Sequence, residues 1–216
     1  GNLADLTRRA EVTLNSVDLI AAEDTRVSRK LLSHYNIQTP LVSYHENNER
    51  SKAVKLVDRL IRGESIALIS DAGTPCISDP GYRLVHSARK KNIEVSTIPG
   101  PSALIAALSI AGIPTDHFYF EGFLPLKKGR KTRFALLESL SATIVIYESP
   151  LRVLRTLKDI EFYWGDRVIS ICKELTKIYE ETYVGMIADA IIYFQKSKLK
   201  GEFVLMIAKK DYQLTK

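Results

Sequence analysis

Hydrophobic positions along the chain follow two spacings, one typical of helices and one typical of strands. Apolar residues three and four positions apart predict helices, and short continuous apolar runs predict strands. Helices are predicted over 4–14, 27–35, 48–62, 82–91 and 102–111, and strands over 17–22, 41–44, 66–69 and 93–98. Strands that alternate with helices in this way favour an α/β fold with a parallel sheet.

The pattern changes at 112–116, where Gly112 and Pro114 end a helix and mark a domain boundary. Beyond it, strands are predicted over 118–120, 143–147, 167–175, 179–184 and 203–208, with one helix before 143 and another over 186–195. Since 167–175 and 179–184 are close in sequence, we expect them to pair antiparallel. We therefore expect two α/β domains, 1–112 with a mostly parallel sheet and 113–216 with a mixed sheet.

Composition is typical of a globular protein, with 45% hydrophobic and 26% charged residues in a chain of 216. No apolar run approaches the ~20 residues that span a bilayer, so we expect no membrane partner. Cys76 and Cys172 form no CxxC pair, and no secretory leader is visible, which predicts free thiols and a cytoplasmic protein. Gly1–Leu3 lead into a helix with no strand before it, so we expect that a first strand is missing.

Two loops rich in glycine and proline form the first candidate site. Ser70–Gly81 follows the strand predicted over 66–69, and Pro99–Ala103 follows the one predicted over 93–98. Open α/β sheets bind ligands at the carboxyl ends of their strands. Glycine lets the backbone approach a ligand and proline stiffens the loop, so we expect the two loops to form two walls of one pocket.

Several common motifs are absent from the sequence. It contains neither GxGxxG nor GxxxxGK[ST], which excludes the usual dinucleotide and P-loop fingerprints. The segment 45–49 (HENNE) departs from HExxH at its last residue, and we expect no metal site. The segment 100–104 (GPSAL) lacks the final glycine of a hydrolase nucleophile elbow, and only His117 follows Ser102.

The formal net charge of the chain is +6, and a cluster of cations stands out within it. The cluster comprises Lys127, Lys128, Arg130, Lys131 and Arg133. A basic loop fits phosphate contacts, whose affinity is electrostatic. A solvated surface loop has the same composition, so charge alone leaves both interpretations open.

Nine short segments occur in a fixed order along the chain: Gly1–Leu3, Ala21–Arg26, Ser70–Pro75, Asp79–Gly81, Pro99–Ala103, Glu121–Pro125, Tyr147–Pro150, Lys173–Lys177 and Gly201–Val204. Together they resemble the ribosomal RNA small subunit methyltransferase I family of the tetrapyrrole methylase superfamily. The resemblance implies two α/β domains that bind S-adenosylmethionine in the cleft between them, and usually a homodimer. It also implies methyl transfer to the ribose 2′-hydroxyl of a cytidine in the decoding region of 16S rRNA, in the small ribosomal subunit.

The resemblance also implies which residues contact the cofactor. From the first domain these are Asp71, Gly73, Thr74, Ile77, Ser102 and Ala103. From the second domain they are Tyr147, Glu148, Leu175 and Glu202. The basic cluster then becomes a candidate for contacts with RNA phosphates.

Methyl transfer to a hydroxyl requires an oriented acceptor and a group that takes the proton. Either Glu23 or Asp24 is the candidate base or ribose-positioning acceptor, with Arg26 holding a phosphate and His45 as the alternative base. A structural ion pair within 23–26 is the competing interpretation. Two other functions stay open, namely a small-molecule methylase of the tetrapyrrole type and a non-catalytic RNA-binding protein on the same fold.

Overall fold

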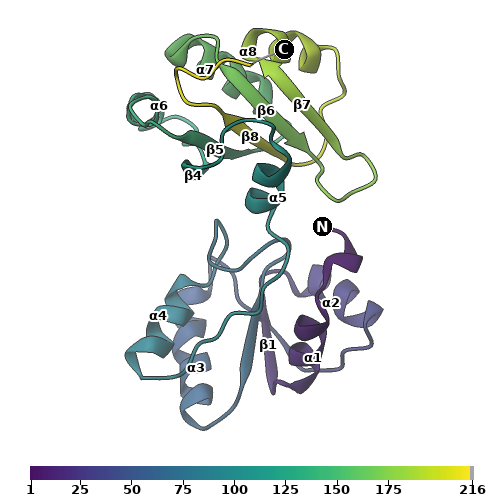
Figure 1. Ribbon diagram of the computed structural model, residues 1–216. Coiled ribbons are helices and arrows are strands. Elements are labelled where there is room, and N and C mark those ends of the chain that lie inside the picture. Colours follow the sequence, from purple (N-terminus) through teal and green to yellow (C-terminus); the bar gives the residue numbers. More distant parts are fainter. Residues whose placement is uncertain (215–216) are drawn as a thin grey trace. The chain divides into compact units, whose positions relative to one another are not determined.

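A computed structural model describes residues 1–214 and divides the chain into two compact units, Gly1–Ser102 and a second unit from Ala103 onward. Each unit has its own sheet with helices packed on it (Figure 1). The division falls before the boundary predicted at Gly112, because helix α5 (Ala103–Ile110) belongs to the second unit. Its buried Leu104, Ala107 and Leu108 pack on the second sheet.

The first unit contains a parallel three-stranded sheet in the order β2-β1-β3. Its elements are the 3-10 helix η1 (Leu3–Asp5), α1 (Arg8–Ser16), β1 (Leu19–Ala22), α2 (Thr25–His34), β2 (Leu41–Ser43), α3 (Glu49–Ile61), β3 (Ile66–Ile69) and α4 (Tyr82–Lys90). The central strand β1 is buried throughout. Helices α1 and α2 cover one face of the sheet, and α3 and α4 cover the other (Figure 1).

The prediction of a strand over 93–98 is wrong, since this segment has no regular structure. Its alternation of half-buried Ile93 and Val95 with exposed Glu94 is typical of an extended chain. A strand, however, also needs a neighbour for its backbone groups. Here the carbonyls of Val95 and Thr97 accept hydrogen bonds from arginine side chains instead. The loop Pro99–Ala103 therefore follows an extended segment and not a strand.

The second unit contains a mixed five-stranded sheet in the order β4-β5-β8-β6-β7, in which only β4 and β5 pair parallel. After α5 its elements are β4 (Phe118–Phe123), α6 (Arg130–Glu138), β5 (Thr143–Glu148), α7 (Val153–Trp164), β6 (Val168–Lys173), β7 (Glu181–Met186), α8 (Ile187–Gln195) and β8 (Phe203–Ile207). The expected antiparallel pairing of β6 with β7 is confirmed. The predictions omit α7, although its buried positions follow helical spacing.

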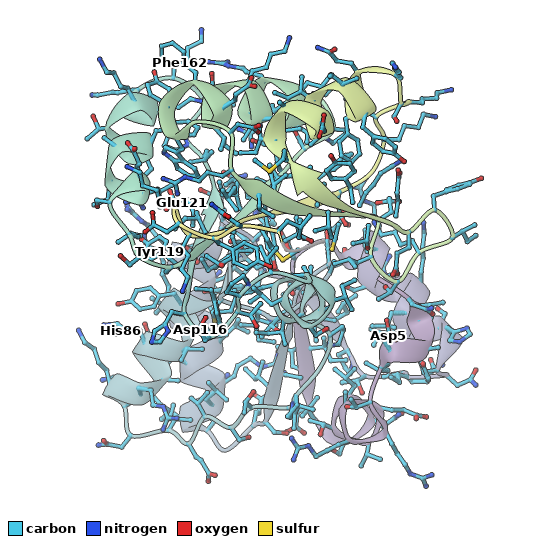
Figure 2. All side chains as sticks on the ribbon, turned by 45° about the horizontal axis from the view of Figure 1, so that its top comes forward. Asp5, His86, Asp116, Tyr119, Glu121 and Phe162 are labelled. Atoms are coloured by element: carbon cyan, nitrogen blue, oxygen red, sulfur yellow. The ribbon has the colours of Figure 1, made fainter. Side chains whose placement is uncertain are left out.

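Helices α6, α7 and α8 pack on one face of the second sheet, and α5 packs on the other (Figure 1). Phe134 of α6 is fully buried in the larger core, with its ring 5.0 Å from that of Tyr163 and 5.4 Å from that of Trp164. Phe162 of α7 instead points outward and is 81% exposed (Figure 2). The same residue type thus occupies opposite environments within one unit.

We expect Phe134→Ala to lower the free energy of unfolding by about 3–5 kcal/mol, because it removes a buried ring and leaves a cavity. The matched variant Phe162→Ala should change it by less than about 0.5 kcal/mol, since that ring is exposed. Urea unfolding followed by circular dichroism measures both. Equal losses in the two variants would contradict this assignment of the core.

Candidate functional site

The ends of β1 and β3 are joined by a hydrogen bond at the carboxyl edge of the first sheet. The backbone N–H of Asp24 donates to Oδ1 of Asp71 over 3.0 Å, and the backbone of Asp71 also lies close enough to Glu23 to lower the pKa of its carboxyl. Since β1 and β3 are parallel neighbours, their carboxyl ends meet at one edge. The structure thus brings together three of the predicted site residues.

Glu23 and Asp24 are adjacent in sequence, but their carboxylates are in different electrostatic states. Burial raises the pKa of Glu23 above its usual 4.5, and the negative charges of Asp79 and Asp71 raise it further. Hydrogen bonds from Arg26 lower the pKa of Asp24 to about 2. Asp24 also caps helix α2 by accepting a hydrogen bond from the backbone N–H of Arg26.

The ion pair considered for segment 23–26 is present, with Arg26 Nη2 2.7 Å from Asp24 Oδ2. The Arg26 side chain is nevertheless 84% exposed, so its guanidinium is open to solvent. His45 follows β2, the other neighbour of β1, and its electrostatic interaction with Glu23 lowers the pKa of that carboxyl. Among the described residues, no hydrogen-bond partner reaches the buried His45 Nδ1.

The two Gly/Pro-rich loops of the first unit contact each other, and their role as two walls of one pocket stays a prediction. Thr74 Oγ1 donates a hydrogen bond to the carbonyl of Pro101 over 3.3 Å. Gly73 has a positive φ of 80°, and no atom lies within 4 Å of the position that a Cβ would occupy there. The loop residues Asp71, Gly73, Thr74 and Ile77 are exposed, as is Ala103, and Ser102 is half-buried. Their polar groups and backbone are therefore accessible to a ligand.

Strand register gathers four loops at one end of the second sheet. Phe123 pairs with Tyr147, Glu148 pairs with Phe203, and Phe203 also pairs with Lys173. The ends of β4, β5 and β6 therefore meet the beginning of β8. The four residues predicted to contact cofactor from this unit, Tyr147, Glu148, Leu175 and Glu202, all lie at this end.

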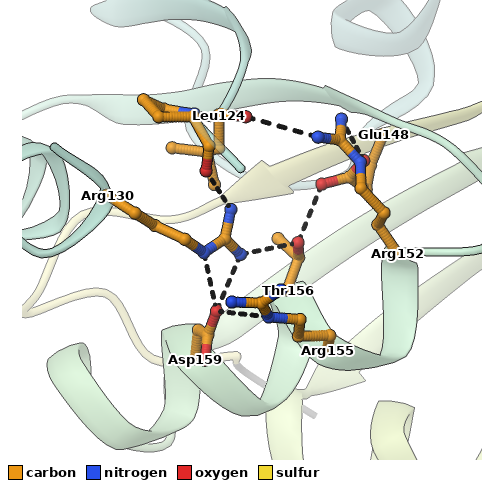
Figure 3. A network of polar contacts seen from close by, with 8 residues as sticks. Leu124, Arg130, Glu148, Arg152, Arg155, Thr156 and Asp159 are labelled. Carbon is orange, nitrogen blue, oxygen red and sulfur yellow. Dashed lines mark hydrogen bonds and ion pairs between the residues drawn. The ribbon is translucent and has the colours of Figure 1, made fainter. Parts of the chain in front are cut away.

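Glu148 and Glu202 differ in accessibility at this end of the sheet. The Glu148 side chain is fully buried, and it binds Arg152 Nη2 at 2.6 Å and the Thr156 hydroxyl at 2.8 Å (Figure 3). The Glu202 side chain is 76% exposed and pairs with Lys177 at 2.9 Å. Lys177 also pairs with Glu174 at 2.7 Å, which ties the β6–β7 hairpin to the start of β8.

The five cations predicted to contact RNA occupy three environments. Lys127, Lys128 and Lys131 are exposed. Arg133 is half-buried, and its Nε lies 2.5 Å from Oε1 of Glu121, a residue of β4 (Figure 2). The Arg130 side chain is only 9% exposed, and it pairs with Asp159 at 2.7 Å (Figure 3).

Sequence reasoning missed three further cations at this end of the second sheet. Lys196, Lys198 and Lys200 are exposed and precede β8. Their alternation in the segment 196–200 (KSKLK) is visible in the sequence. Their proximity to the end of β5 depends on the pairing of β8 with β5, which the sequence does not indicate.

Two absences hold for residues 1–214. Every helix there is too short or too polar to cross a lipid bilayer. No three His, Cys, Asp or Glu side chains in that part of the chain gather in a way that could hold a metal ion.

Comparison with known proteins gives consistent matches along the chain. A family model described as Tetrapyrrole (Corrin/Porphyrin) Methylases matches residues 1–191. A Halalkalibacterium halodurans protein named ribosomal RNA small subunit methyltransferase I is 50% identical over 209 residues, which cover 96% of this chain and 72% of that protein. The protein of the same name from Thermotoga maritima is 44% identical over 211 residues, which cover 98% of this chain and 95% of that protein.

Solved structures extend the comparison at much lower identity. Diphthine synthase aligns with a TM-score of 0.73 at 11% identity, covering 96% of this chain and 86% of that one. Cobalt-precorrin-4 methyltransferase, a cobalamin biosynthetic enzyme, aligns with a TM-score of 0.69 at 14% identity, covering 96% of this chain and 90% of that one. These likenesses concern the fold alone, and they confirm the predicted fold class.

The electrostatics at the end of β1 lead to a test by NMR. We expect Glu23 to titrate above 4.5, and Asp79→Asn to lower its pKa by removing a negative charge that opposes ionisation. Glu46→Gln is the matched control, since Glu46 is exposed and is not among the charges that act on Glu23. Titration of the carboxyl carbon signals measures the shift. An unchanged Glu23 pKa in Asp79→Asn would refute this account of the site.

Proposed function

Since this chain belongs to the tetrapyrrole methylase family, and within it to the ribosomal RNA small subunit methyltransferase I proteins, we propose that it methylates 16S rRNA. The methyl donor is S-adenosylmethionine, and the acceptor is the ribose 2′-hydroxyl of a cytidine in the decoding region of the small ribosomal subunit. The observation that carries the proposal is identity of 50% over 96% of the chain. The protein works in the cytoplasm as a homodimer.

The acidic edge of the first sheet suits a cationic methyl donor. Asp71 and Asp79 lie close enough to Glu23 to raise its pKa, so the local potential is negative. S-adenosylmethionine carries a sulfonium and an ammonium group, which a negative potential attracts. When bound, it supplies a methyl group that is already electrophilic. The open space beside Gly73 lets a ligand approach the backbone, which supports cofactor contacts along this loop.

We assign the cofactor contacts to the residues that the family resemblance suggested. In the first unit these are Asp71, Gly73, Thr74, Ile77, Ser102 and Ala103. In the second unit they are Tyr147, Leu175 and Glu202, whereas the fully buried Glu148 holds the end of β5 through Arg152 and Thr156. This division follows the accessibility of each side chain in its own unit.

Among the candidate bases, Glu23 has the most suitable carboxylate. Its raised pKa makes it a stronger proton acceptor than Asp24, whose pKa of about 2 favours the ionised form. In the proposed reaction the Glu23 carboxylate accepts the proton of the ribose hydroxyl, whose oxygen takes the methyl group as the carbon–sulfur bond of the donor breaks and S-adenosylhomocysteine leaves. Orientation of the acceptor can itself supply ~7–11 kcal/mol of the barrier reduction. His45 remains the alternative base.

Contacts with RNA phosphates are assigned to accessible cations. Arg26 is held by Asp24 and is 84% exposed, which leaves its guanidinium available for a phosphate. Lys127, Lys128 and Lys131 are exposed, and Arg133 is half-buried. Their contacts depend on charge, so RNA affinity should fall as salt concentration rises.

The first test uses 16S rRNA from a strain that lacks this protein. Primer extension at low nucleotide concentration stops at a 2′-O-methylated ribose. We expect the stop at the decoding-region cytidine to vanish in that strain and to return when the intact gene is restored. A stop that persists without the protein would disprove the assigned substrate.

The second test concerns the base. We expect Glu23→Gln to lower kcat by about 10²–10⁴-fold, because the amide cannot accept the proton. The Kd for S-adenosylmethionine, measured by calorimetry, should stay close to that of the wild type. Asp24→Asn should have a smaller effect on kcat, and the exposed control Glu46→Gln should have almost none. If His45→Asn lost more activity than Glu23→Gln, His45 would be the base instead.

A further inference from the structure

Two arginines, the buried Arg130 and the half-buried Arg152, hold the backbone of the loop that carries Lys127 and Lys128. Arg130 Nη1 donates to the carbonyl of Pro125 over 3.0 Å, and Arg152 Nη1 donates to the carbonyl of Leu124 over 3.4 Å (Figure 3). We call the segment Leu124–Gly129 the basic loop. Its two lysines are exposed and of like charge, so they provide no attraction that would hold the loop in place.

The other contacts of Arg130 lie in the interior of the second unit. Its Nε and Nη2 bind Asp159 Oδ2 at 2.8 and 2.7 Å, and Nη2 also donates to the Thr156 hydroxyl over 3.0 Å. Its guanidinium carbon lies 5.1 Å from the centre of the Phe134 ring. All three guanidinium nitrogens are therefore engaged. Because Arg130 begins α6, where the helix dipole disfavours a cation, the negative charge of Asp159 is also needed there.

Thr156 connects this arginine to the end of β5. Its side chain is fully buried, and its hydroxyl accepts from Arg130 and donates to Glu148 Oε2 over 2.8 Å (Figure 3). The second oxygen of Glu148 binds Arg152 Nη2 at 2.6 Å. An unbroken series of contacts therefore connects Glu148, at the end of β5, with the carbonyls of Leu124 and Pro125 in the basic loop.

We propose that Arg130 is a positioning residue that fixes the basic loop, through Thr156 and Glu148, so that Lys127 and Lys128 face the RNA. Arg130 itself does not contact RNA. The planar guanidinium reaches three partners at fixed angles, which a lysine ammonium cannot do. The expected effect on RNA binding rests on the proposed function. The expected effect on the order of the basic loop does not.

The first experiment compares Thr156→Val with Thr156→Ser, which differ in the hydroxyl that joins Glu148 to Arg130. Trypsin cleaves after Lys127 and Lys128, and mass spectrometry identifies the cuts in the folded chain. We expect these cuts to be about tenfold faster in Thr156→Val, the fold-change that one charge-assisted hydrogen bond supplies. Thr156→Ser should resemble the wild type. Equal cleavage in the two variants would overturn the proposal.

The second experiment measures binding of a 16S rRNA fragment that contains the decoding region. Arg130→Lys keeps the charge but loses the planar guanidinium with its several donors, so we expect the Kd for the RNA fragment to rise about tenfold. If Arg130 contacted a phosphate directly, the lysine would preserve affinity, and the proposal would be wrong. Lys131→Gln is the matched control, because it removes an exposed cation from the residue next to Arg130. It should reduce the slope of log K for RNA binding against log salt concentration by about 0.7–0.9. It should not make tryptic cleavage of the basic loop faster.

The two experiments separate this inference from the proposed function. If the wild-type protein bound no RNA, the proposed function would fail, while the cleavage result would still decide whether the network orders the basic loop. Thermal unfolding of each variant shows whether a difference in cleavage comes from that loop or from the whole unit. Faster cleavage confined to Lys127 and Lys128 supports the positioning role, and faster cleavage throughout the second unit contradicts it.

Discussion

The pairing of β8 between β5 and β6 determines where the loops of the second unit lie. Backbone hydrogen bonds align Phe203 with Glu148 on one side and with Lys173 on the other. This antiparallel register brings the last strand of the sequence to the centre of the sheet. Segments far apart in sequence, at 124–129, 149–152, 174–180 and 196–202, consequently emerge at one end. Both the proposed cofactor contacts of this unit and its exposed lysines depend on that arrangement.

Charges are held in opposite ways in the two units. In the second unit, the buried Glu148 and Arg130 are paired and hydrogen-bonded, as removal of charge from water requires. In the first unit, burial raises the pKa of Glu23, and the like charges of Asp79 and Asp71 raise it further. The first arrangement neutralises buried charges, and the second leaves a carboxylate with an elevated pKa. The same residue type therefore has different electrostatic properties in different surroundings.

Much of the fold follows from local pattern. The strand at Ile66–Ile69 and the helix that begins at Tyr82 lie where apolar spacing and neighbouring Gly81 predict them. The extended segment 93–98 shows the limit of this reasoning, because its alternation is correct and its partner strand is absent among the described residues. Periodicity reports which side of a segment is buried, whereas a strand also requires another backbone beside it. The boundary between the units likewise depended on where α5 packs.

The sequence by itself determined the family, the two α/β units and the chemical character of each loop, because ordered motifs and residue types are visible in the amino-acid sequence alone. Only the tertiary structure distinguished residues of like type. It separated the accessible Lys127 from the buried Arg130, and Glu23 with its raised pKa from Asp24 with its lowered one. Burial and the pKa of a carboxylate depend on neighbours that folding brings from distant positions, such as Asp159 beside Arg130 and Asp79 beside Glu23.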